Sequence, residues 1–335
     1  MADASGVSQT TVSLILAGDT SINVSDTTRE RVLSTATSLG YVPQAAARAL
    51  VQGRSNVLAL VLYDPHAQIF RDPYIPNVMT GLIDVAGKQD YRLLVERIPA
   101  GADLTIVNNL LRGRQADGVV MVNVRAKSPI LSALHGDGYP IVVLDTFEEH
   151  RLPSVGIDHR GGIRALTQHL VSLGHRRIGC IPYTPIDNDH MRERFGAFRS
   201  VLESNGLEID MSLVVSGRMD PDTGSAAMQQ ILAHPSPPTA IFAMNDMMAL
   251  GALHACAKAG VRVPDDIAIV GYDDMRFSEF LTPALTTVRA PEIELGRAAA
   301  SALLDMIEGK SNQFVYRELE TELVIRASCG AAAPR

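Results

Sequence analysis

Cysteine is scarce in this sequence, and its spacing argues against metal sites and disulfide frameworks. The three cysteines, Cys180, Cys256 and Cys329, lie far apart and form no Cys-x-x-Cys pair, and no histidine stands at a ligand-like spacing. Zinc sites and redox pairs need closely spaced ligands. We therefore expect reduced thiols in an intracellular protein that holds no metal or other cofactor.

Long hydrophobic runs are also missing. No run approaches the roughly 18 apolar residues that a membrane-crossing helix needs. No positively charged segment followed by an apolar stretch, the pattern of a signal peptide, is found near Met1. The sequence thus predicts a soluble, cytoplasmic protein with no membrane partner.

The motifs that mark common enzyme classes are absent. The sequence has no Gly-x-Gly-x-x-Gly after its first apolar strand, no Gly-x-x-x-x-Gly-Lys loop, no Gly-x-Ser-x-Gly and no His-Glu-x-x-His. Such motifs hold nucleotide phosphates, a nucleophilic serine or a zinc ion. We expect no enzyme activity and no catalytic residues, and a nucleotide-dependent oxidoreductase in particular is excluded.

Positive charge is not in excess. The formal net charge is −7, and residues 1–56 contain four arginines and four acidic residues, so this segment is neutral. An acidic protein repels nucleic acid over most of its surface. If DNA is bound, we expect a small domain to bind it, with weak attraction to the phosphates.

The N-terminal segment has the pattern of a helix-turn-helix. Gly6 can adopt the positive φ of a tight turn, and Ser8 can cap the next helix. One face of that helix is apolar at 3.6-residue spacing, and the other is short and polar, as in helices that enter the major groove. An ordinary helical hairpin has the same pattern. The residues predicted to contact DNA from this helix are Ser8, Gln9, Thr10, Thr11, Ser13 and Leu14.

Two further helices are predicted before residue 56. Ser25 or Asp26 can cap one that ends at Gly40. Its apolar residues, expected to face the helix-turn-helix, are Val32, Leu33, Ala36 and Leu39. Residues 45–51 form a short alanine-rich helix, which is too short to be stable in water without a partner.

The rest of the chain alternates apolar strands with amphipathic helices. Strands are predicted at residues 57–63, 91–96, 118–122 and 141–144, and the pattern starts afresh at 154–157, 177–181, 213–215, 240–243 and 267–270. This alternation is typical of parallel sheets covered by helices on both faces. We predict an α/β fold with two doubly wound lobes, preceded by the helix-turn-helix headpiece.

An ordered series of motifs resembles the lac repressor (LacI/GalR) family of bacterial transcription regulators from about residue 2 to about residue 326. The series includes Gly-Val-Ser-x-x-Thr-Val-Ser at 6–13, Gly-Tyr-Val-Pro at 40–43, Ala-Arg-Ala-Leu at 47–50, Asn-Asp-x-Met-Ala-Leu-Gly at 245–251, Val-Gly-Tyr-Asp-Asp at 270–274 and Pro-x-Leu-Thr-Thr-Val at 283–288.

The resemblance implies three regions. These are a headpiece at 1–43 whose first helix is truncated, a hinge helix and linker at 44–56, and an effector-binding core at 57–335. In the core, it implies a first lobe at about 57–153 and 288–318 and a second lobe at about 154–287 and 319–335, with the helix 292–307 in the first lobe.

The resemblance also implies operator DNA as a partner and a homodimer that binds two half-sites. Leu50 matches the leucine that the family inserts into the minor groove, and Ala47 lies beside it on the hinge helix. Leu14 stands where the family commonly has an arginine. For this reason the family's base preference does not transfer to this chain.

Polar residues directly after predicted strands are candidates for binding a small effector, because strand ends of such sheets line the ligand cleft. Asp145, Asn245 and Asp273 follow strands, and Arg194 lies near a helix start. Their oxygens and guanidinium suit the hydroxyl groups of a sugar. Asp246 and Asp274 also follow strands, but a helix-capping role is equally consistent. The resemblance assigns the same four positions to the effector.

The remaining effector candidates are less specific. Met219 stands where many family members have an aromatic residue, and Ala290 replaces a common polar residue, which leaves a nucleoside open beside a sugar or sugar derivative. Tyr63, Phe70 and Asp72 lie in or beside the first strand-to-helix loop. We predict a repressor controlled by a small molecule, and a solute-binding protein of the same two-lobe fold is the alternative.

Overall fold

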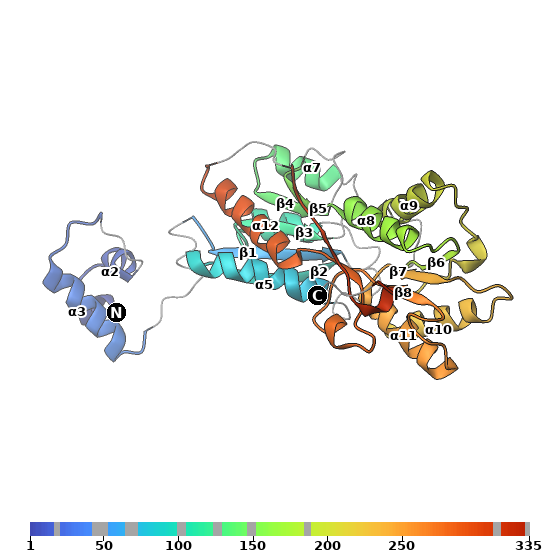
Figure 1. Cartoon of the computed structure of the whole chain (residues 1–335). Coiled ribbons are helices and arrows are strands. Elements are labelled where there is room, and N and C mark those ends of the chain that lie inside the picture. Colours follow the sequence, from blue (N-terminus) through green and yellow to red (C-terminus); the bar gives the residue numbers. More distant parts are fainter. Residues whose placement is uncertain are drawn as a thin grey trace.

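The computed structural model describes residues 1–16, 21–41, 53–63, 73–98, 105–122, 129–145, 152–183, 189–310 and 316–331. These residues form three helices near the N-terminus, followed by two α/β lobes (Figure 1). The predicted hinge-helix residues Ala47 and Leu50 lie outside this description, as do Phe70 and Asp72 and the side chain of Tyr63.

The N-terminal helices are α1 (Ala2–Ser5), α2 (Gln9–Leu16) and α3 (Asp26–Ser38). Gly6 has φ +65° at the end of α1, as the turn requires. The Ser8 hydroxyl accepts a hydrogen bond of 3.1 Å from the Thr11 amide, so Ser8 caps α2. Of the two possible caps of α3, the structure uses Ser25, which accepts from the Thr28 amide.

Val12, Ile15 and Val32 form the small core between α2 and α3. Two residues expected to face this core do not: Leu33 is 46% exposed and Leu39 is 56% exposed. Successive helical residues are about 100° apart, so the stripe of α3 that packs at Val32 and Ala36 turns Leu33 outward. Leu39 follows the last residue of α3, which leaves it beyond the packed stripe.

The first lobe contains a parallel six-stranded sheet in the order β10-β5-β4-β3-β1-β2. Its strands are β1 (Val57–Tyr63), β2 (Arg92–Ile98), β3 (Gly118–Val122), β4 (Ile141–Leu144), β5 (Ser154–Ile157) and β10 (Tyr316–Leu319). Its helices are α5 (Tyr74–Ala86), α6 (Thr105–Arg112), α7 (Pro129–Gly136) and α12 (Glu292–Ile307).

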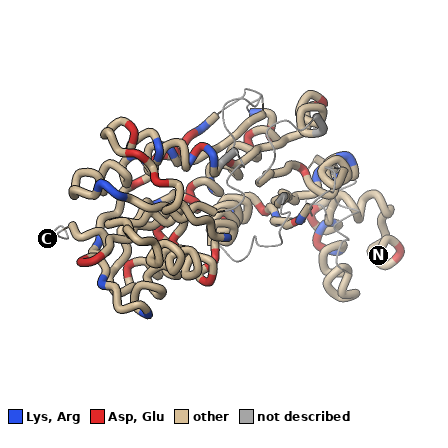
Figure 2. Tube along the Cα trace, turned by 90° about the vertical axis from the view of Figure 1, so that its right-hand side faces the viewer, with Lys and Arg blue, Asp and Glu red and all other residues tan. Residues whose placement is uncertain are grey.

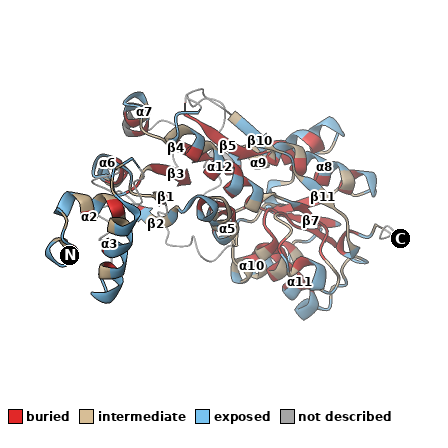
Figure 3. Cartoon of the chain, turned by 90° about the vertical axis from the view of Figure 1, so that its left-hand side faces the viewer, coloured by how far each residue is buried: buried red, intermediate tan, exposed pale blue. Residues whose placement is uncertain are grey.

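Strand β1 is apolar throughout because helices cover both faces of the sheet. Leu58, Leu60 and Leu62 pack with α5 and α12. Ala59 and Val61 pack with residues of α6 and α7 on the other face. Figure 3 shows the inner strands β3, β4 and β5 as buried, with exposed helix surfaces around them.

The second lobe contains a three-stranded parallel sheet of β6 (Ile178–Ile181), β7 (Ala240–Ala243) and β8 (Ala268–Val270). One face packs against α8 (His159–Ser172) and α9 (Asp189–Ser204), and the other against α10 (Pro221–Leu232) and α11 (Asp246–Ala259). The strand expected at 213–215 is instead the end of a 3₁₀ turn, Met211–Leu213, followed by a single bridge from Val214 to Cys180.

Three segments connect the lobes. The chain passes from β5 into α8, from β9 (Thr287–Arg289) into α12, and from β10 into β11 (Glu322–Val324), which pairs with β9 in antiparallel fashion. The helix expected at 292–307 is confirmed as α12.

The lobe boundaries differ from those expected at 153/154 and 287/288. Strand β5 pairs with β4 and β10 in the first sheet. Val288 of β9 packs in the core of the second lobe. The crossings therefore fall after Ile157 and after Arg289, a few residues later than the hydrophobic pattern indicated, because an apolar strand looks the same in either sheet.

Candidate functional site

The polar face of α2 is presented to solvent, as predicted. Ser8, Gln9, Thr10 and Ser13 are exposed, and Thr11 and Leu14 are partly exposed. The hydroxyls of Ser8 and Thr11 are 2.8 Å apart, so these two side chains also bind each other. Gln9, Thr10 and Ser13 lie beside this pair on the exposed face.

The charge near α2 is sparse. The Arg31 guanidinium donates to the Ser5 carbonyl at 2.9 Å and so ties α3 to α1. Charged residues of both signs are scattered over the rest of the trace without gathering into one large patch (Figure 2). An interface of this kind depends on hydrogen bonds to DNA more than on counterion release.

Four of the residues predicted to bind the effector, Asp145, Arg194, Asn245 and Asp273, lie together where the chain passes between the lobes. We call the interlobe cluster the set Tyr74, Asp145, His159, Arg194, Asn245, Tyr272 and Asp273. Its first-lobe part is Tyr74 at the start of α5 and Asp145 directly after β4. The Tyr74 hydroxyl donates to Asp145 at 2.5 Å, and the Ile157 amide donates to the other carboxylate oxygen at 3.1 Å.

The second-lobe part begins with His159, which is only 6% exposed. His159 Nδ1 lies 2.7 Å from the Tyr272 hydroxyl, and His159 Nε2 lies 3.7 Å from Asp145 Oδ1. One ring therefore contacts residues of both lobes.

Arg194 on α9 lies over these rings. Its guanidinium carbon is 4.8 Å from the centre of the Tyr272 ring and 5.8 Å from that of Tyr183. One guanidinium nitrogen is 3.1 Å from both ring nitrogens of His159. A nitrogen equidistant from both cannot point along either lone pair, so this contact is a stacking one.

The electrostatics of the cluster fix two protonation states. Burial alone lowers the pKa of Arg194, but Tyr183, Tyr272, Asp273 and Asp145 raise it above its usual value, so the guanidinium stays charged. Burial, followed by Asp145, raises the pKa of Tyr74, so its hydroxyl remains a donor.

The far end of the cluster is formed by Asn245 and Asp273. Asn245 caps α11 by accepting from the Met248 amide at 2.9 Å, and its amide nitrogen lies 3.4 Å from Asp273. Asp273, three residues after the end of β8, has φ +109°, a strained conformation that aims its side chain. Met219 also has a positive φ, +61°, before α10; its contact with an effector stays a prediction.

The two neighbouring acids are structural. Asp246 is fully buried and accepts from the Met275 amide and from the hydroxyls of Ser278 and Thr287. Asp274 forms ion pairs with Arg289 at 2.8 Å and with Arg326 at 2.7 Å. Both hold the crossing segments to the second lobe.

Sequence reasoning did not select His159, Tyr272 or Glu292. His159 and Tyr272 follow strands β5 and β8 by one or two residues, so the rule that found Asp145 also applies to them. Glu292 is buried at the start of α12 and accepts from the Asn77 side chain at 2.7 Å. Only the fold brings it near Tyr74, whose pKa it raises.

Two negative findings concern the described residues only. They contain no group of three His, Cys, Asp or Glu side chains placed to hold a metal ion. None of their helices has both the length and the apolar composition needed to cross a membrane.

Comparisons with known proteins agree with this architecture. Residues 1–44 match the family model of bacterial regulatory proteins, lacI family, and residues 167–329 match that of the periplasmic binding protein-like domain. The chain is 35% identical over 326 residues to the HTH-type transcriptional regulator CelR of Thermobifida fusca, covering 96% of this chain and 95% of CelR. The chain belongs to the lacI family of bacterial regulatory proteins.

Other members of the lacI family are similar over nearly the whole chain. The repressor CytR of Escherichia coli K12 is 31% identical over 310 residues, covering 92% of this chain and 89% of CytR. The solved CelR–cellobiose complex has a TM-score of 0.73 at 33% identity, and the lac repressor dimer bound to operator and the anti-inducer ONPF has 0.86 at 26% identity. Each structure covers 98% of both chains.

These findings confirm the predicted family and fold class, and they make the chain a DNA-binding transcriptional regulator of the lacI family and not an enzyme. The alternative of a solute-binding protein is set aside, since the headpiece itself matches the regulatory family.

Proposed function

We propose that this regulator is a cytoplasmic homodimeric repressor whose operator affinity is set by a small sugar bound at the interlobe cluster. The observation that carries the proposal is the contact of His159, on the second lobe, with Asp145 on the first, beside Arg194, whose pKa the Asp145 charge raises. A ligand that inserts among these groups must change how the two lobes meet.

The chemistry of the cluster suits hydroxyl groups. Asp145 and Asp273 accept hydrogen bonds, and Arg194 donates them in a fixed fork. The ring of Tyr183, which is partly exposed, offers an apolar face on which the C–H face of a pyranose can lie. The similarity to a CelR–cellobiose complex supports a β-linked disaccharide as the first ligand to test.

A nucleoside is the second candidate. Met219 in place of an aromatic residue and Ala290 in place of a polar one leave room for a flat base. The partly exposed Tyr183 ring can stack on a base as well as on a sugar.

The mechanism is thermodynamic linkage. Effector that changes the angle between the lobes shifts the packing of two first lobes in the dimer, and this spacing decides whether two headpieces fit two half-sites. Coupling of this type amounts to about 1–3 kcal/mol, and operator DNA must change effector affinity by the same factor.

A thermal-shift screen of disaccharides, monosaccharides and nucleosides tests the effector class. A ligand that binds only the folded protein raises its melting temperature by mass action. We expect cellobiose or a related disaccharide to raise it and the nucleosides to leave it unchanged. A shift with nucleosides alone would replace the sugar proposal by the second candidate.

A further inference from the structure

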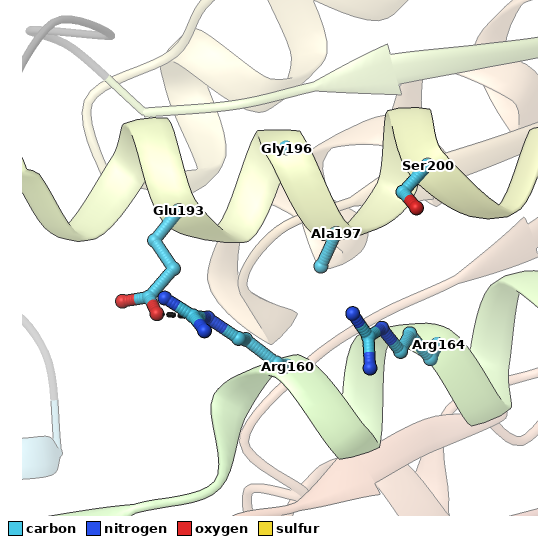
Figure 4. Close-up of a pocket in the computed structure, with 6 residues that line it drawn as sticks. All are labelled: Arg160, Arg164, Glu193, Gly196, Ala197 and Ser200. Atoms are coloured by element: carbon cyan, nitrogen blue, oxygen red, sulfur yellow. Dashed lines mark ion pairs between the residues drawn. The ribbon is translucent and has the colours of Figure 1, made fainter. Parts of the chain in front are cut away.

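A groove separate from the interlobe cluster lies between α8 and α9. Its cavity measures about 240 Å³. Its lining comes from Arg160 and Arg164 on α8 and from Glu193, Gly196, Ala197 and Ser200 on α9 (Figure 4). The volume is several times the roughly 30 Å³ of one water molecule in the liquid, so it suits a small metabolite.

The charges on the α8 side are unfavourable without an anion. Arg160 and Arg164 are four residues apart, so their guanidinium groups repel each other across one helix turn. Both lie in the first two turns of α8, where the helix dipole disfavours cations, and the first turn contains no acidic residue. Figure 4 shows the Arg164 side chain directed toward Ala197 and Ser200.

One carboxylate faces two guanidinium groups. Glu193 forms an ion pair with Arg160. Among the residues that the structure describes, Arg164 forms no ion pair or hydrogen bond. Arg164 is therefore the guanidinium group of the groove that has no ion-pair partner in the described part of the chain, although the carboxylates of Asp158, the N-cap of α8, and Glu318 also lie nearby.

Glu193 has an acceptor left over. Its side chain is 11% exposed, and its Oε2 is buried without a hydrogen-bond partner in the described part of the chain. Burial also raises the pKa of this carboxyl group. An unsatisfied buried acceptor is costly, so Glu193 gains if its carboxylate turns toward the groove and accepts a hydrogen bond from a ligand there.

The α9 side of the groove is kept open by small residues. A Cβ atom added at Gly196 would meet no atom within 4 Å, so packing does not require glycine at this position in the helix. Glycine destabilises a helix interior relative to alanine. Ser200, one turn further along, places a hydroxyl donor opposite Arg164.

We propose that this groove is a second ligand site that takes a small phosphorylated polyol. Arg160, Arg164 and the Ser200 hydroxyl donate to the phosphate group, and the Glu193 carboxylate turns toward the groove to accept from a hydroxyl of the ligand. Two residues of the groove are sequence neighbours of residues in the interlobe cluster: Arg160 directly follows His159, and Glu193 directly precedes Arg194.

Calorimetric titration of the full chain with glycerol 3-phosphate at low salt tests this site. We expect saturable binding of this probe and binding about tenfold weaker or more for inorganic phosphate, since phosphate alone does not reach Glu193. Arg164→Glu and Ser200→Glu each place a carboxylate where the phosphate binds. Each is expected to weaken binding about tenfold or more, the size of one lost charge-assisted hydrogen bond.

The matched control is Arg199→Glu. Arg199 lies on α9 beside Ser200, is 63% exposed and does not line the groove, and its substitution changes the charge as much as Arg164→Glu does. Its affinity for glycerol 3-phosphate should equal that of the unmodified protein. Absence of binding to the unmodified protein at millimolar probe, or equal losses in Arg164→Glu and Arg199→Glu, would overturn the proposal.

Discussion

At the scale of single residues, Arg194 is the side chain on which the interlobe cluster converges. It contacts His159 and the rings of Tyr183 and Tyr272, and the charges of Asp145 and Asp273 act on it. The Arg194 guanidinium group lies over two aromatic rings and is already positioned before a ligand binds. This lowers the entropy lost on binding.

Arg194→Ala is expected to lower effector affinity about ten- to hundredfold, the range for losing hydrogen bonds from a charged donor. Operator binding without effector should be retained, because Arg194 is remote in sequence and fold from α2. Calorimetry with the screened effector measures the loss, with Arg199→Ala on the same helix as control. Unchanged effector affinity in Arg194→Ala contradicts the site assignment.

Asp246 gives the protein a pH-dependent stability. Burial raises its pKa to about 7, although the hydroxyls of Ser278 and Thr287 and the Met275 amide favour the carboxylate. Because the folded-state pKa lies above the ordinary value, the folded protein holds a proton that the unfolded chain releases. The stability from this proton is complete below about pH 4 and is lost as the pH rises to about 7.

Relative to Asp246→Asn, the free energy of unfolding of the unmodified protein should therefore fall with rising pH by up to about 1.4 kcal/mol per unit between pH 5 and 7. Above pH 7 the difference should be constant. Urea denaturation of both proteins at several pH values provides the measurement. Parallel curves over the whole range would show that Asp246 is ionised in the folded protein.

Individual site residues could be predicted where a polar side chain follows an apolar strand. Asp145, Asn245 and Asp273 were found because each directly follows an apolar strand, and the fold does bring them together with Arg194. Tyr74 and Glu292 belong to helix starts far apart in sequence, and only the packing of α5 against α12 places them near each other. The hydrophobic pattern of one segment does not indicate which distant segment packs against it.

At the scale of elements, each lobe contains a helix pair that crosses at facing glycines. A Cβ at Gly81 of α5 would lie 2.0 Å from the Ile293 carbonyl oxygen, and one at Gly296 of α12 would lie 2.1 Å from that of Val78. In the second lobe, a Cβ at Gly251 of α11 would lie 1.9 Å from the Pro221 carbonyl oxygen. The backbones are thus in contact, and no side chain fits between them.

Gly81→Ala should force α5 and α12 apart and destabilise the protein by about 1–3 kcal/mol, the usual cost of overpacking. Gly87→Ala is the matched control, since a Cβ there meets no atom within 4 Å and φ is −63°. Chemical denaturation measures both variants. Equal stability of the two would show that the helix crossing has room to adjust.

Helices and strands could be predicted where their hydrophobic pattern and their packing partners lie within a short stretch of sequence. Strands β1, β4 and β7 have the expected bounds, because each has apolar residues bounded by breakers, whereas the bounds of helix α12 came from the family resemblance. The assignment of β5 to a lobe was wrong, since the short segment Ser154–Ile157 does not specify which sheet it joins. Leu33 was placed inward on composition, whereas its angle on α3 turns it to solvent.

At the scale of the whole molecule, the outer surface of the first lobe has an apolar residue suited to a dimer. Ile83 on α5 is 51% exposed, although the neighbouring Leu82 is fully buried. The chain is similar in fold to the lac repressor that was solved as a dimer, with a TM-score of 0.86. We infer that Ile83 contacts a second copy of this chain.

Ile83→Asp should raise the dimer dissociation constant about tenfold or more, because a carboxylate is then desolvated at an apolar contact. Met211→Asp is the control, since Met211 is 61% exposed but belongs to the second lobe. Analytical ultracentrifugation over a range of concentrations distinguishes them. A larger increase of the dimer dissociation constant in Met211→Asp would indicate that the dimer interface lies on the second lobe.

The most direct measurement of the central claim is the affinity for an operator selected from genomic fragments, by fluorescence anisotropy with and without saturating effector. The account predicts specific binding at low salt and a change of about 5- to 150-fold in the dissociation constant on adding the effector, matching a coupling of about 1–3 kcal/mol. Specific binding whose dissociation constant is the same with and without the bound effector would contradict it.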